Sequence, residues 1–206
     1  MTGRRHAVAP HDRVLATATQ LFLEHGIQAV SLRRIIAEAD VAQMTPYRRF
    51  SGKDELVAMS LEQWGARWLH WLTHRIERRG DDPKARWSGL WDAIEEWRTT
   101  DGRHGSLILT AAAELRGTPA HPASAVIEAH QRAVRQVLED LAKQTGADDP
   151  TTLAAELHVV LEGAMTAAVV DRWSPHAPSA RAVADAVLAA HLPALGRAID
   201  RARRTS

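Results

Sequence analysis

The chain has 206 residues with 45% hydrophobic and 25% charged side chains, a balance typical of a globular protein with a core and not of a disordered chain. It contains no cysteine, which excludes disulfides, thiolate metal sites and cysteine nucleophiles. The formal net charge is only +1, and there is neither a recognisable signal peptide nor an apolar run near the ~20 residues of a membrane span, so we expect a cytoplasmic protein without a membrane partner.

Helical periodicity dominates the chain, and no alternating pattern with hairpin turns predicts a β-strand. Clusters of glycine, proline and aspartate divide this pattern near residues 26, 40, 51–52, 80–83, 101–102, 116–122, 146–150 and 174–179. The sequence therefore predicts an all-α protein of about nine helices.

The first helix is expected from Asp12 to His25, and Gly26 follows it where a left-handed C-cap favours glycine. Its buried face would consist of Val14, Leu15, Ala18, Leu21 and Phe22. Ser31 is placed as the N-cap of a short second helix, whose buried stripe would be Leu32, Ile35, Ile36 and Ala39.

A tight turn at residues 40–42 separates the second helix from a third short one at 43–50. Ser51 and the acid three positions later, Asp54, then resemble a capping box that opens a long fourth helix. Two short helices around a tight turn can place the second helix in the major groove of DNA, but the same pattern also fits a purely structural subdomain. Residues 1–52 carry seven Lys or Arg against four Asp or Glu, which is compatible with either reading.

The residue pattern of the stretch 11–60 resembles the DNA-binding domain of the TetR (tetracycline-repressor) family. The matching residues are Ala18, Phe22, Gly26, Ser31, Ile35, Ala39, Val41, Thr45, Tyr47, Phe50, Lys53 and Leu56. The resemblance implies a flexible basic arm at residues 1–11, a DNA-binding domain at 12–60 with its helix-turn-helix at about 31–50, and a ligand-binding and dimerisation domain at 61–206.

The resemblance also implies roles in DNA binding for individual side chains. Tyr47 and Lys53 match positions that hold phosphates, and Arg33 is a further phosphate candidate. Gln43, Met44 and Arg48 match positions that reach base edges, where glutamine can pair with adenine and arginine with guanine. The full predicted DNA-binding set is Arg33, Gln43, Met44, Thr45, Tyr47, Arg48, Arg49 and Lys53.

Three residues depart from the usual pattern of the family. Asp40 replaces a glycine of the turn, which is tolerable because aspartate accepts left-handed geometry better than most residues. Arg49 replaces a frequent histidine. Pro46 replaces a leucine or isoleucine, and because proline is comfortable only in the first turn of a helix, the recognition helix would begin late or be distorted.

Six of the seven tryptophans fall in two adjacent predicted helices of the body. Several tryptophans around a cavity can hold a flat or apolar ligand, although a stripe at helical spacing is more often core. The predicted ligand-binding residues are Trp64, Trp68, Trp71, Trp91 and Trp97. The ligand would be an unidentified small effector, apolar or aromatic, and no cofactor is expected.

His70 and His74 have the i, i+4 spacing that lets two imidazoles share a metal, but no third ligand is recognisable and the sequence gives no metal site. Two later helices carry apolar stripes that would form a four-helix bundle between two subunits, with Pro193 kinking the last helix. The predicted dimer interface is Leu157, Val160, Leu161, Ala164, Ala168, Val187, Leu188 and Leu195.

The resemblance to the family therefore implies a repressor that binds a palindromic operator as a homodimer and is released by a small molecule. An enzyme is not expected, because the chain has no G-x-S-x-G elbow, no phosphate-binding glycine loop and no H-E-x-x-H motif. A helical adaptor that binds protein through an inactive DNA-binding fold is the alternative, and the presence of Tyr47 and Lys53 counts against it.

Overall fold

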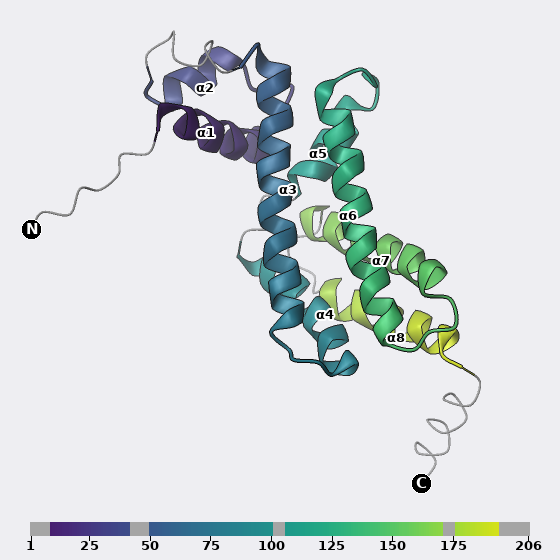
Figure 1. Ribbon diagram of the computed structural model, residues 1–206. Helices are drawn as coiled ribbons and strands as arrows, with labels where there is room; N and C mark the ends of the chain where they lie inside the picture. Colours follow the sequence, from purple (N-terminus) through teal and green to yellow (C-terminus); the bar gives the residue numbers. More distant parts are fainter. Residues whose placement is uncertain (1–8, 42–49, 101–105, 171–175, 194–206) are drawn as a thin grey trace, which may run out of the picture. The chain divides into compact units, whose positions relative to one another are not determined.

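The computed structural model describes residues 9–41, 50–100, 106–170 and 176–193 (Figure 1). Within these ranges the chain is helical and contains no strand. The helices are α1 (Pro10–His25), α2 (Leu32–Glu38), α3 (Lys53–Glu77), α4 (Pro83–Thr99), α5 (Leu107–Leu115), α6 (Pro122–Gln144), α7 (Pro150–Val170) and α8 (His176–His191). The predicted all-α fold is therefore confirmed; the predicted helix at 43–50 falls almost entirely outside the described residues.

The chain divides into two compact units. The first unit contains residues 1–67 and 106–130, and the second contains residues 68–105 and 131–206. Helices α3 and α6 each contribute residues to both units. The contacts thus group residues 106–130 with the amino-terminal residues, which a division of the sequence near residue 60 does not anticipate.

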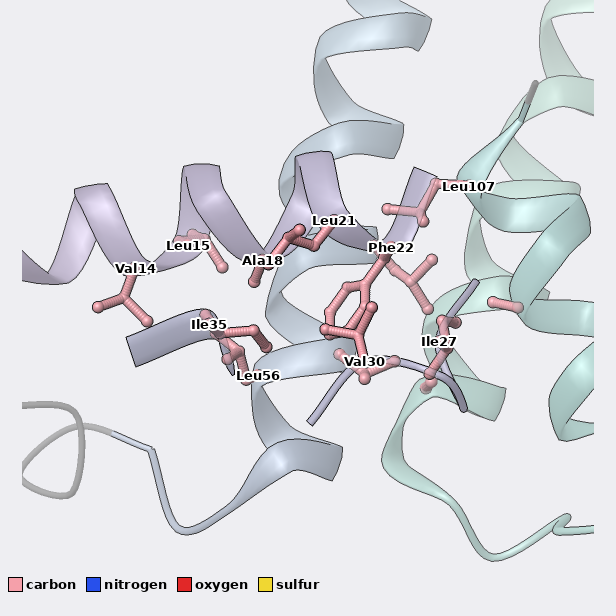
Figure 2. Packing of buried hydrophobic residues seen from close by; sticks show 14 of the residues in the cluster. Val14, Leu15, Ala18, Leu21, Phe22, Ile27, Val30, Ile35, Leu56 and Leu107 are labelled. Carbon is pink, nitrogen blue, oxygen red and sulfur yellow. The ribbon is translucent and has the colours of Figure 1, made fainter. Parts of the chain in front are cut away.

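The first unit is built around an apolar core that joins α1, α2, α5 and the beginning of α3 (Figure 2). Phe22 of α1 and Ile35 of α2 are fully buried, and Leu107 of α5 packs into the same cluster. Burial of each such side chain contributes roughly 1.5–3 kcal/mol relative to exposure. The stripe predicted for the first helix is the buried face of α1, because all five of its members are buried.

Local signals fix the ends of the first two helices. Gly26 ends α1 with φ = 83°, a region that glycine enters without a Cβ penalty. The Ser31 hydroxyl accepts a hydrogen bond from the backbone N–H of Arg34 at 3.2 Å, so the predicted N-cap of α2 is confirmed. Asp40 has φ = 49°, and it is the only non-glycine residue of the described chain with positive φ. The turn therefore keeps the left-handed geometry with aspartate in the place of glycine.

The capping arrangement at the start of α3 differs from the prediction. The backbone N–H and the hydroxyl of Ser51 both donate to Glu55 Oε2, at 2.6 Å and 2.7 Å. Ser51 is therefore bonded to Glu55, four positions later, and not to Asp54, and its hydroxyl donates where a capping box would have it accept. Asp54 lies 3.4 Å from the ring nitrogen Nε2 of His121 instead.

The second unit packs α7 against α8 and both helices against α4. Its core contains tryptophans of α3 and α4 together with leucines of α6 and α7, among them Trp68, Trp91, Leu138 and Leu157. The indole N–H of Trp87 donates to Asp185 Oδ1 at 2.6 Å, which adds a polar link between α4 and α8.

The carboxyl-terminal helix begins earlier than the sequence predicted. Helix α8 starts at His176, inside the stretch 174–179 that was expected to break helices. It ends at His191, two residues before Pro193, which fits the restriction that proline places on the residue before it, Leu192. A kink at Pro193 would involve residues outside the described ranges, so it stays a prediction.

Candidate nucleic-acid interface

Most of the predicted DNA-binding side chains lie outside the described residues. These are Gln43, Met44, Thr45, Tyr47, Arg48 and Arg49. The described chain resumes at Phe50, whose side chain is buried in the core of the first unit. The imidazole of His11 stacks on the Phe50 ring with centroids 5.0 Å apart and an interplanar angle of 12°. Phe50, which lies just before α3, is thus attached to the beginning of α1.

The neighbouring arginines of α2, Arg33 and Arg34, differ in their hydrogen-bond partners. Arg34 Nε donates to Glu38 Oε1 at 2.7 Å, and Arg34 Nη2 donates to His25 Nε2 at 2.9 Å. Arg33 is exposed and makes no hydrogen bond or ion pair with another described residue. Arg33 is therefore the arginine of this pair whose guanidinium is available to an external anion, as a phosphate contact requires.

Lys53 is the first residue of α3, where the free backbone N–H groups of the helix favour an anion. Its ammonium group lies 3.5 Å from the backbone carbonyl of Gln28, in the turn that joins α1 to α2. A contact of this length is weak, so the charge of Lys53 remains available to a phosphate at the helix terminus.

Glu114 of α5 supports the same turn, and no sequence pattern singled it out. Its carboxylate accepts hydrogen bonds from the backbone N–H groups of Ile27 at 3.1 Å and Gln28 at 2.7 Å. The Gln28 amide in turn donates to the Glu114 backbone carbonyl at 3.0 Å. A Cβ at Gly26 would lie 2.5 Å from Glu114 Oε1, so the close approach of this carboxylate also requires glycine there. The partners are far apart in the sequence, which is why periodicity does not reveal them.

The structure separates the predicted ligand-binding tryptophans into two groups. Trp68, Trp91 and Trp97 are 5%, 2% and 3% exposed and are core residues of the second unit. Whether they also contact a ligand stays a prediction. Trp64, which belongs to the first unit, and Trp71 are half-buried. A surface pocket of about 240 Å³ is lined without any tryptophan, by Arg75, Arg78, Arg79, Gly89, Asp92, Ala93 and Glu96.

The predicted dimer stripe on α7 faces the core of its own chain. Leu157 and Leu161 are 0% exposed and Ala164 is 7% exposed, because they pack inside the second unit. These three residues therefore contribute little area to an interface. Val160, Val187 and Leu188 are half-buried, the side chain of Ala168 is not described, and Leu195 lies outside the described residues.

The exposed apolar residues of α7 lie on the face opposite Leu157 and Leu161, and one further exposed valine lies on α8. Val159 and Val170 of α7 are 72% and 81% exposed, and Val183 of α8 is 52% exposed. They are the large hydrophobic side chains most exposed to solvent among the described residues. Gly163 lies between the two valines of α7, and a Cβ placed on it meets no atom within 4 Å. Nothing inside the described chain accounts for a glycine in mid-helix, which costs about 1 kcal/mol relative to alanine.

His70 and His74 stack on the surface of α3 with ring centroids 6.3 Å apart. In the described ranges, no group of three or more His, Asp or Glu side chains gathers around a common point. No helix of the described chain has both the length and the hydropathy that a membrane span needs.

The capped short helix α2, the left-handed turn at Asp40 and the exposed Arg33 are compatible with a helix-turn-helix regulator, whose second short helix would fall in residues outside the described ranges. Residues 14–59 match the family model described as bacterial regulatory proteins, tetR family. The amino-terminal region of the chain is therefore similar to a domain of the TetR family. The proteins that share this likeness are regulatory proteins.

Relatives of known structure cover nearly the whole chain. The TetR-family regulator SCO4454 of Streptomyces coelicolor is 28% identical, with a TM-score of 0.82 over 89% of this chain and 96% of its own. A putative TetR-type regulator of Streptomyces avermitilis is 25% identical, with a TM-score of 0.68 over 86% of this chain and 98% of its own.

The repressor DrrR1 of Streptomyces coeruleorubidus is 31% identical over 100 residues, which are 46% of this chain and only 33% of that protein.

Proposed function

We propose that the chain is a ligand-responsive transcriptional repressor that binds a palindromic operator as a homodimer. The observation that carries this proposal is the match of residues 14–59 to the DNA-binding domain of a family of regulators. Arg33 and Lys53 would hold phosphates, Tyr47 would add a further phosphate contact, and Gln43 and Arg48 would read bases. Such a regulator acts where the DNA is, and we place it in the cytoplasm on that ground.

The exposed apolar face of α7 and α8 supports the dimer. Val159, Gly163 and Val170 follow one another at spacings of four and seven residues, so they share one side of α7. Val183 is a further exposed valine on α8, the helix that packs beside α7. A second copy that presents the same face would cover these valines and form a four-helix bundle, and Gly163 would let the helices approach closely. The interface would thus use these residues in place of Leu157 and Leu161.

The effector would act by shifting the equilibrium between a state that binds DNA and a state that does not. A small molecule can release the operator only if its affinity differs between the DNA-competent state and the incompetent one. The body of the chain is the part that would hold it, and Trp71 of the second unit remains a candidate for its apolar contacts because it is half-buried.

Selection from a random library of DNA duplexes tests the proposal. Purified wild-type protein is compared with Tyr47→Ala and Arg48→Ala at one fixed salt concentration. The wild type should enrich a sequence with two half-sites and bind it as two chains per duplex. Loss of Tyr47 should weaken all sequences alike, whereas loss of Arg48 should change the preferred base.

Failure to enrich any sequence would contradict the proposal and favour the adaptor, whose DNA-binding fold would then serve protein binding. Enrichment of a single half-site, bound by one chain, would leave DNA binding intact but refute the dimer. If the selected duplex is bound with equal affinity in the presence and in the absence of every effector tested, the proposed ligand response is refuted and DNA binding still stands.

A further inference from the structure

The surface pocket of about 240 Å³ lies where the end of α3 meets α4, and all of its lining residues belong to the second unit. Its charged groups are three arginines from the end of α3 and the turn after it, and two acids of α4. A cavity of roughly 150 Å³ can hold benzene, so this pocket has room for a small molecule with one ring.

Two of the three arginines are held by the acids of α4. Arg79 Nη2 donates to Asp92 Oδ2 at 2.7 Å, and Arg75 Nη2 donates to Glu96 Oε1. Arg181 of α8 donates from Nη1 to the other oxygen of Asp92 at 3.4 Å. The carboxylates of the pocket are thus already paired with guanidinium groups, and these pairs hold two arginine side chains at its wall.

The third arginine of the pocket, Arg78, is exposed, and its guanidinium makes no hydrogen bond or ion pair with another described residue. The lining therefore carries three positive charges against two negative ones, and the excess charge is that of Arg78. A guanidinium presents parallel N–H donors that match the two oxygens of a carboxylate, and it stays charged at every physiological pH. One free guanidinium at the pocket thus matches one carboxylate group.

Small residues of α4 leave the space beside these guanidinium groups. Gly89 and Ala93 line the pocket and are both buried. A Cβ at Gly89 would lie 2.7 Å from Arg79 Cγ, so any larger residue there would displace the Arg79 side chain. Glycine in the middle of a helix is unfavourable relative to alanine, but here its missing side chain leaves room for the pocket.

We infer that this pocket binds a small organic carboxylate, whose carboxylate group accepts hydrogen bonds from Arg78. The inference goes beyond the proposed function, because binding at this site involves neither DNA nor a second subunit. The remainder of the ligand would lie over Gly89 and Ala93. A cation would meet an excess of positive charge, and a phosphate dianion would bring more negative charge than the lining leaves unpaired.

Titration of the full chain with three probes that share a phenyl ring tests this inference. Benzoate carries the carboxylate, benzamide is its neutral analogue, and phenyl phosphate is the dianion. Binding of each probe to protein without DNA is followed by ligand-observed NMR at one low salt concentration. Arg78→Gln removes the free guanidinium, and Arg67→Gln is the matched control, because Arg67 is an exposed arginine of α3 outside the pocket. Gly89→Leu fills the pocket without a change of charge.

We expect wild-type protein and Arg67→Gln to bind benzoate about tenfold more tightly than benzamide, and phenyl phosphate more weakly than benzoate. Arg78→Gln should abolish the preference for benzoate over benzamide. Gly89→Leu should weaken benzoate binding by about fivefold or more. If Gly89→Leu fails to fold by circular dichroism, Gly89→Ala replaces it and should weaken binding to a smaller extent.

Four results would overturn the inference. They are equal binding of benzoate and benzamide to the wild type, no binding of benzoate at millimolar concentration, tighter binding of phenyl phosphate than of benzoate, and an unchanged affinity for benzoate in the folded variant at Gly89. An equal loss in Arg67→Gln and Arg78→Gln would also overturn it, because the benzoate would then respond to the charge of the surface and not to the pocket.

Discussion

The carboxylate of Glu114 accepts a hydrogen bond from the backbone N–H of Gln28 at 2.7 Å, across 86 positions of the sequence. This contact fastens α5 to the turn between α1 and α2. Glu114 therefore supports the turn between α1 and α2 from outside the amino-terminal 60 residues, in agreement with the grouping of residues 106–130 with the first unit.

Replacement of Glu114 by alanine is expected to destabilise the first unit by about 1–3 kcal/mol, because two backbone donors lose a charged acceptor. Urea unfolding at neutral pH measures the change. Glu62→Gln is the control, since Glu62 is an exposed residue of α3 in the same unit and has no hydrogen bond there. Equal midpoints for wild type and Glu114→Ala would show that the turn is stable without α5.

The adjacent arginines of α2 should respond differently to replacement. Arg33→Ala is expected to weaken operator binding for all sequences alike and to reduce the salt slope by about 2, because each subunit of the dimer loses one phosphate contact. Arg34→Ala should change binding less, since Arg34 is held by Glu38 and His25. Fluorescence anisotropy at several salt concentrations measures both. A larger effect of Arg34→Ala would reverse the assignment.

A charge placed on the exposed face of α7 should separate the proposed dimer. Val159→Glu would bury two like charges at a symmetric interface and is expected to weaken association by about 3 kcal/mol or more. Gly163→Leu should act in the same way without disturbing the chain itself, because its Cβ meets no atom within 4 Å. Light scattering with size-exclusion chromatography measures the mass.

Ala129→Glu on α6 provides the control for this face, since it also replaces an exposed small residue by glutamate. It should leave the mass unchanged. If both Val159→Glu and Gly163→Leu remained dimeric, the subunits would have to meet elsewhere.

The start of α3 should lose stability in acid. The Ser51 backbone N–H, followed by the Ser51 hydroxyl, lowers the pKa of Glu55 from its ordinary value of 4.5. A lowered pKa in the folded state means that the contribution is fully present above pH 4.5 and is lost as pH falls through the folded value. The melting temperature of wild type should therefore exceed that of Glu55→Gln at pH 6, and the difference should shrink below pH 4.5. A constant difference across this range would show that the carboxylate charge contributes nothing.

The sequence by itself determined the features that depend on neighbours along the chain. Ser31 caps α2, Gly26 ends α1 and Asp40 turns the chain, because caps and positive φ are set within a few residues. The buried stripe of α1 follows from helical spacing in the same way. The DNA-binding pattern of residues 14–59 is local too, so the family was recognisable without coordinates.

Only the tertiary structure decided which face of a long helix meets which partner. The stripe of Leu157 and Leu161 and the face of Val159 are both apolar, and periodicity cannot say which one the chain itself covers. The same limit applies to Trp91, a large side chain that fits a core or a pocket equally well until its neighbours are known. The links of Glu114 to Gln28 and of Gln131 to Glu162 join distant segments, and only the packing of the helices brings such polar groups within hydrogen-bond distance.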